Sequence, residues 1–223
     1  MTAGLLTALI VECPAAEPVV GRHRRRLDRA AALGVPAHVT VVFPFVPLRD
    51  LTERDHDHLD ALFSAVPPFE LVGARTGWFG DTALYVEPAD PRPLVALVDL
   101  VVAAFPQAPP YGGAFPEVVP HLTIGHDHPR AELRAAEREV GPLLPVRQPV
   151  ECVDLWSGPA PESGVGRWQR VRRYPFAAPG STGAGPGSGR LDARSGDAAG
   201  QAGRRVGPPQ GLDDRPQRTL DLG

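Results

Sequence analysis

Lysine is absent from the 223 residues of this chain, and the basic side chains other than histidine are all arginines. A lysine that carries an adenylate or a Schiff base is therefore excluded, and so is the lysine of a phosphate-binding P-loop. The lysine on which protein kinases depend is missing as well. We therefore expect no use of ATP.

Cysteine and long apolar runs are also scarce. Cys13 and Cys152 are the only thiols, and their spacing fits neither a metal site nor a redox pair. No apolar run is long enough to span a membrane, and the apolar start of the chain lacks the basic residues of a signal peptide. We expect a cytoplasmic protein without a membrane partner and take a monomer as its default state.

Basic charge is too sparse for a protein that coats nucleic acid. The formal net charge is −3 at pH 7, whereas non-specific binding to DNA or RNA needs a basic surface. A small nucleotide or an RNA end is still a suitable ligand.

The composition changes after Phe176, the last aromatic residue. Residues 177–223 are rich in Gly, Pro, Ala, Arg and Asp, and they contain no apolar run that could offset the entropy of ordering. We predict one globular domain over residues 1–176 and a disordered tail over residues 177–223.

Two stretches repeat the pattern histidine, apolar residue, threonine, apolar residue. They are HVTV at residues 38–41 and HLTI at residues 121–124. Side chains alternate between the two faces of a strand, so His38 shares a face with Thr40, and His121 shares a face with Thr123. Two imidazoles, each beside a hydroxyl, predict a site that binds a phosphate and transfers protons.

The elements around these motifs repeat too. TALIVE at residues 7–12 returns as TALYVE at residues 82–87, and each copy precedes a predicted helix and a His-x-Thr strand. The repeat units cover about residues 5–80 and 81–176. We expect an α+β fold of two pseudosymmetric lobes, each an antiparallel-type sheet with helices on its outer side, and an active-site cleft between them.

Hydrolysis of a phosphodiester without a metal needs a base, an acid on the opposite side, and donors to the non-bridging oxygens. Histidine titrates near neutral pH and can serve as acid or base. We therefore expect His38 and His121 to form the acid–base pair and Thr40 and Thr123 to bind the phosphate, with no metal or other cofactor.

These motifs, HVTV followed by FPF and then HLTI, resemble the signature of the two-histidine (2H) phosphoesterase superfamily, which includes RNA 2′,3′-cyclic phosphodiesterases and 2′-5′ RNA ligases. The resemblance covers residues 5–176. It implies that His38 is the proton donor and His121 the proton acceptor. It also implies that an RNA end or a small cyclic nucleotide is opened to a 2′-phosphate, with ligation as the reverse reaction. Many members carry a basic residue where this chain has His126, which leaves the contacts to RNA open.

Five further residues are candidates for contacts with the substrate. Phe45, Tyr111 and Phe115 flank the motifs in predicted loops, where an aromatic ring can stack on a base; packing or pinning of the loop is the alternative. Arg170 and Arg172 share a face of the last predicted strand, where one of them can reach the site; a surface role is the alternative.

The first predicted helix, over residues 17–34, has a face rich in arginine that can contact a nucleic-acid backbone. We favour a solvated face for these side chains. They are Arg22, Arg24, Arg25, Arg26 and Arg29.

Two other functions stay open. His56-Asp57-His58 and His126-Asp127-His128 have the composition of metal-ligand pairs, which would fit a metal-dependent phosphoesterase. A module that binds nucleotides or RNA ends without turnover is the other alternative.

Overall fold

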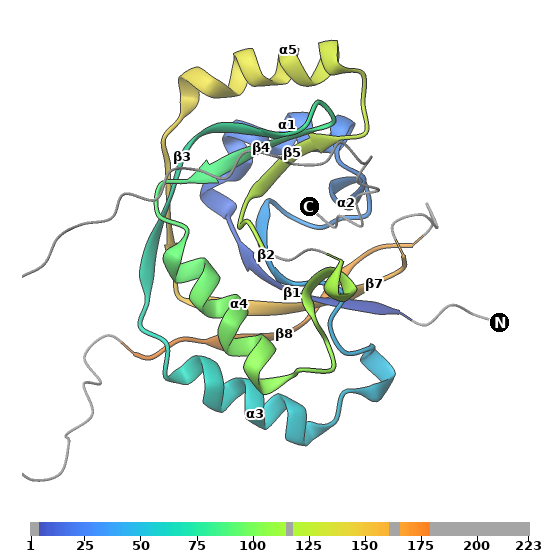
Figure 1. Cartoon of the computed structure of the whole chain (residues 1–223), viewed down its shortest axis with the longest axis vertical. Coiled ribbons are helices and arrows are strands. Elements are labelled where there is room, and N and C mark those ends of the chain that lie inside the picture. The colour runs from blue at the N-terminus through green and yellow to red at the C-terminus, as the bar shows by residue number, and fades with distance from the viewer. Residues whose placement is uncertain (1–4, 115–117, 161–165, 179–223) are drawn as a thin grey trace, which may run out of the picture. The chain divides into compact units, whose positions relative to one another are not determined.

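The structure, a computed structural model, describes residues 5–114, 118–160 and 166–178 (Figure 1). Phe115 and the part of the predicted tail from residue 179 onward lie outside these ranges. The strands are β1 (Leu6–Glu12), β2 (His38–Val42), β3 (Phe69–Phe79), β4 (Ala83–Pro88), β5 (Leu122–His126), β6 (Val146–Val150), β7 (Cys152–Gly158) and β8 (Gln169–Pro175). The α-helices are α1 (Glu17–Leu27), α2 (Arg29–Ala32), α3 (Glu53–Ser64), α4 (Arg92–Ala104) and α5 (Arg130–Val140).

The strands form two four-stranded antiparallel sheets. The first sheet has the order β2-β1-β7-β8 and the second has the order β5-β4-β3-β6. Each sheet therefore has a His-x-Thr strand at one edge, next to the strand that carries TALIVE or TALYVE. The predicted α+β fold with two antiparallel sheets is confirmed.

Each sheet takes strands from both sequence repeats. The third strand of the first repeat, β3, pairs with β4 of the second repeat, and the equivalent strand β7 pairs with β1. The two lobes are therefore not the two halves of the chain. Because the repeats exchange strands, neither sheet can form from one repeat alone.

The helices follow the same exchange. Helix α1, which comes after β1, contacts β5 of the second sheet, whereas α4, which comes after β4, contacts β2 of the first sheet. Figure 1 shows α1 and α5 beside the second sheet and α3 and α4 beside the first. One apolar core joins residues of both sheets, such as Leu9, Val39, Leu84 and Leu122. No helix in the described ranges is long and apolar enough to cross a membrane.

Two helix boundaries follow from local chemistry. Thr52 caps α3, since its hydroxyl accepts from the Asp55 amide at 3.3 Å while the Asp55 carboxylate accepts from the Thr52 amide at 2.9 Å. The predicted helix over residues 17–34 is instead divided at Asp28, whose backbone is extended. The Asp28 carboxylate accepts from the Ala30 amide at 2.8 Å and so caps α2.

Candidate active site

Both His-x-Thr motifs lie on edge strands, and these strands contact each other. Figure 1 shows β2 and β5 side by side at the centre of the fold. Val39 and Leu122 point into the core, so His38, Thr40 and Thr123 lie on the other face of their strands. The fold thus brings the two motifs together although they are far apart in the sequence.

The two histidines are held by the same hydrogen bond. Nδ1 of His38 lies 2.7 Å from the carbonyl oxygen of Pro36, and Nδ1 of His121 lies 2.8 Å from the carbonyl oxygen of Val119. A carbonyl can only accept, so each Nδ1 carries the proton and donates it. Nε2 is therefore the nitrogen of each neutral ring that can accept a proton from a substrate or a water.

Several polar atoms of the motifs are buried. His38 is 2% exposed, Thr123 is 3% exposed and Thr40 is 9% exposed. Nε2 of His38 and Oγ1 of Thr123 make no hydrogen bond within the described residues. A buried polar atom without a partner costs free energy, so these two atoms are candidates for contact with a ligand. Nε2 of His126, outside the two motifs, also makes no hydrogen bond within the described residues.

Burial lowers the pKa of His38 to about 4. The positive charge of Arg24 contributes to the same effect, and a smaller contribution comes from His121. His38 is therefore neutral in the free protein at pH 7.

Arg24 corrects one prediction for the arginine-rich face of the first helix. Its side chain is 2% exposed and pairs with Asp28 at 2.6 Å, with Asp28 fully buried. The side chain points inward, where its guanidinium donates to the Asp28 carboxylate and, at 3.5 Å, to the carbonyl oxygen of Val35. Arg22, Arg25, Arg26 and Arg29 are exposed, as predicted.

Aromatic rings border His121. The rings of His121 and Phe79 form a T-shaped pair with 4.9 Å between centroids, and the ring of His121 lies 5.3 Å from that of Tyr85. Neither aromatic residue was singled out in the sequence. The available signal was the position of Tyr85 in TALYVE, on the strand next to the second motif.

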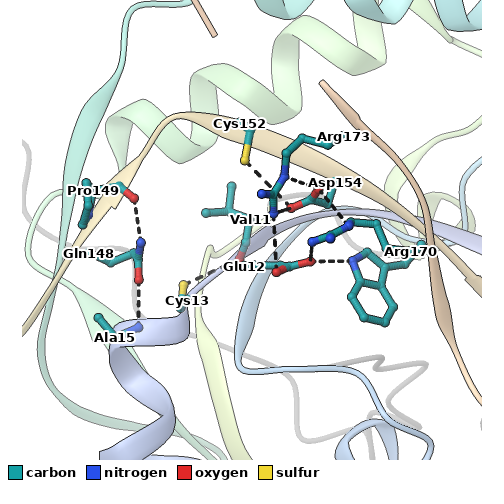
Figure 2. Close-up of polar contacts among 11 residues, drawn as sticks. Val11, Glu12, Cys13, Ala15, Gln148, Pro149, Cys152, Asp154, Arg170 and Arg173 are labelled. Carbon is teal, nitrogen blue, oxygen red and sulfur yellow. Dashed lines mark hydrogen bonds and ion pairs between the residues drawn. The ribbon is translucent and has the colours of Figure 1, made fainter. Parts of the chain in front are cut away.

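A cluster of charges occupies the face of the first sheet that carries His38 (Figure 2). Arg173 donates from Nε and Nη2 to the two carboxylate oxygens of Asp154, at 2.8 and 2.9 Å. Arg170 donates to Glu12 at 3.2 Å, and Glu12 stands opposite His38 in the β1–β2 pairing. Asp154 is fully buried while both arginines are half exposed, so the carboxylates anchor guanidinium groups that reach solvent.

The predicted shared face of Arg170 and Arg172 is wrong. Trp156 pairs with Arg170 and the preceding Leu155 pairs with Arg172, so the register shifts by one residue between them. This β-bulge sends Arg172 to the opposite face, where it donates to Asp60 of α3 at 2.6 Å. The sequence missed Arg173, Glu12 and Asp154, although the acidic residue at the end of TALIVE and TALYVE was a usable signal.

The aromatic candidates from the sequence lie elsewhere. Phe45 is 4% exposed and packs edge-on against Phe105 at 5.0 Å, so the core alternative is correct and Phe45 cannot stack on a base. Tyr111 is half buried, and its amide donates to the carbonyl of Phe43 at 2.6 Å, which ties its loop to the end of β2. Phe115 lies outside the described residues.

The His-Asp-His stretches make other contacts. His56 Nδ1 lies 2.7 Å from the Tyr174 hydroxyl, and the His58 ring lies 5.3 Å from that of Phe105. His126 is buried, with Nε2 3.9 Å from Asp28. Within residues 5–114, 118–160 and 166–178, no three His, Cys, Asp or Glu side chains are grouped so that they could hold a metal ion.

The comparison with solved structures found one with this fold and others with a weaker overall similarity. TT0787 of Thermus thermophilus is 18% identical, with a TM-score of 0.52 over 76% of this chain and 97% of that chain. Escherichia coli LigT complexed with 3′-AMP is 19% identical, with a TM-score of 0.49 over 79% of this chain and all of that chain. No protein with a curated description matches this chain.

The family comparison agrees with the motifs. The model of the 2′-5′ RNA ligase superfamily matches residues 11–160, a span that contains both His-x-Thr motifs and most of both sheets. This match confirms the resemblance to two-histidine phosphoesterases, and the chain belongs to the 2′-5′ RNA ligase superfamily.

Proposed function

We propose that this protein is an enzyme that hydrolyses 2′,3′-cyclic phosphodiesters, on RNA ends or small nucleotides, to 2′-phosphates without a metal. The observation that carries this proposal is the matched pair of histidine hydrogen bonds. Both imidazoles donate from Nδ1 to the carbonyl two residues earlier, so both present Nε2 for proton transfer. Membership of a superfamily of phosphoesterases and ligases supports the same chemistry.

In the proposed reaction, His121 Nε2 takes a proton from a water that attacks the phosphorus. The bond between phosphorus and the 3′ oxygen breaks, and His38 Nε2 gives a proton to that oxygen. The product is a 2′-phosphomonoester with a free 3′ hydroxyl. Thr40 and Thr123 donate hydroxyl hydrogens to the non-bridging oxygens. If a ribose hydroxyl attacks the cyclic phosphate in place of water, the same groups form a 2′-5′ linkage.

The pKa of His38 sets a condition on this mechanism. A proton donor must be charged before it acts, but burial and Arg24 lower the pKa of His38 to about 4 in the free protein. A phosphodiester anion next to Nε2 favours the charged imidazole and raises this pKa again. His38 would therefore become protonated when the substrate binds.

The decisive experiment is turnover of 2′,3′-cyclic AMP, and of an RNA oligomer that ends in a cyclic phosphate, in the presence of EDTA. His38→Ala and His121→Ala should each lower kcat/KM at least about a thousandfold. His58→Ala is the matched control, because His58 is exposed on α3 and should leave the rate unchanged.

Other outcomes identify the alternatives. Loss of activity in EDTA, restored by zinc or manganese, would support a metal-dependent phosphoesterase. Tight binding of 2′-AMP without turnover would support a binding module. Full activity of either His38→Ala or His121→Ala would refute the two-histidine mechanism.

A further inference from the structure

Phe79 and Tyr85 form an aromatic pair next to the proposed proton acceptor. Their rings stack with 4.3 Å between centroids and an interplanar angle of 29°, and both contact the ring of His121. All three side chains are partly exposed. Aromatic surface is thus available beside the imidazole.

The register of the second sheet places this pair on the face that carries Thr123. Tyr85 stands directly opposite Thr123 on β5 and opposite Gly77 on β3, and such partners share a face of the sheet. A Cβ atom at Gly77 would lie 2.7 Å from the Tyr85 ring. Because Gly77 has no side chain, the ring of Tyr85 can lie over β3 at this position, on the face that carries Thr123.

Core packing does not account for these rings. Neither Phe79 nor Tyr85 belongs to an apolar cluster of the described residues, whereas the adjacent Trp78 packs against the core from the opposite face. Two large aromatic side chains that are outside the core and partly exposed keep apolar surface in contact with water. Such a patch commonly marks a binding surface.

We infer that Phe79 and Tyr85 form a stacking platform for the nucleobase of the substrate. The inference rests on the proposed function, because it places the cyclic phosphate at His121 and Thr123 and the base next to it. Stacking tolerates every base and strengthens with the size of the ring system. The preferred substrates are therefore cyclic phosphates that carry a base, with purines ahead of pyrimidines and both ahead of base-free cyclic phosphodiesters.

The test compares kcat and KM for 2′,3′-cyclic AMP, 2′,3′-cyclic CMP and the base-free glycerol 1,2-cyclic phosphate. Tyr85→Leu and Phe79→Leu should raise KM for cyclic AMP by about 5- to 150-fold, several times more than for the base-free compound. Tyr85→Phe should retain the wild-type preference because it retains the ring. Phe69→Leu is the matched control, since Phe69 lies at the other end of β3 and stacks on Phe176.

A loss that falls on kcat and is equal for all three substrates would overturn the inference, because the rings would then only position His121. If the leucine variants do not fold, the substrate preference of the wild type still tests whether the base is bound. Equal kcat/KM for cyclic AMP and the base-free compound would also overturn it.

If the wild type turns over none of the three, the proposed function fails and equilibrium binding tests the platform alone. Tyr85→Leu should then weaken binding of 2′-AMP and leave binding of inorganic phosphate close to that of the wild type. Equal weakening of both ligands would overturn the platform.

Discussion

Arg24 forms a buried ion pair with Asp28 one helical turn further on, with 2.6 Å between Nη2 and Oδ2. The pair lies where α1 ends and α2 begins, and Asp28 also caps α2. The charge of Arg24 reaches the site, because it contributes to the lowered pKa of His38. A structural element of the helix junction is therefore coupled to the proposed proton donor.

Replacement of Arg24 should destabilise the protein strongly. Arg24→Met leaves the carboxylate of Asp28 buried without its partner, which should lower the free energy of unfolding by about 3–5 kcal/mol. Arg25→Met, at an exposed neighbouring position, should cost less than about 0.5 kcal/mol. Urea denaturation measures both.

A double variant separates the charge from the cap. Asp28→Asn keeps an oxygen for the Ala30 amide but removes the negative charge, so Arg24→Met with Asp28→Asn should recover part of the loss. A double variant no more stable than Arg24→Met alone would contradict this account.

His38 should make stability depend on pH. Its pKa is about 4 in the folded protein, against an ordinary value of 6.5, so the unfolded chain binds the proton more readily. The free energy of unfolding is unaffected by His38 above pH 6.5 and decreases as the pH falls from 6.5 toward 4. At pH 4 the decrease amounts to about 3 kcal/mol. Urea denaturation of the wild type and His38→Gln at pH 7 and pH 4.5 should show a smaller loss in the variant. Equal losses would show that His38 is not the group responsible.

Thr123 should show a conflict between stability and activity. Its buried hydroxyl makes no hydrogen bond within the described residues, so Thr123→Val removes an unsatisfied group and should leave stability unchanged or raise it by about 1 kcal/mol. The same change removes a proposed donor to the phosphate and should lower kcat about 100-fold. Thermal unfolding and steady-state kinetics on 2′,3′-cyclic AMP measure the two effects. A clear loss of stability would mean that the hydroxyl has a structural partner.

Arg170 and Arg172 should differ in their effect on RNA substrates. Arg170 lies on the face that carries His38, whereas Arg172 faces α3 and pairs with Asp60. Arg170→Gln should raise KM for an RNA oligomer with a cyclic-phosphate end and reduce the slope of log KM against log salt by roughly 0.7–1. Arg172→Gln should keep the wild-type slope. A change of slope in Arg172→Gln alone would place the RNA on the opposite side of the first sheet.

The sequence was most informative where a local pattern carried the signal. The His-x-Thr spacing placed each imidazole and its threonine on one face of a strand, and the echo of TALIVE in TALYVE predicted two equivalent sheets. The site around the motifs was less predictable. Residue spacing predicts neither the bulge that separates Arg170 from Arg172 nor the inward orientation of Arg24. Both depend on contacts with segments that are distant in the sequence.

The sequence alone determined the residue chemistry, the duplication and the superfamily. Its motifs and its lack of lysine predicted histidine acid–base catalysis of a phosphate ester. Only the tertiary structure decided that the repeats exchange β3 and β7, that β2 meets β5, and that Tyr85 and Phe79 border His121. Side-chain alternation is a local property of a strand, whereas strand order and burial depend on which distant segments exclude water together.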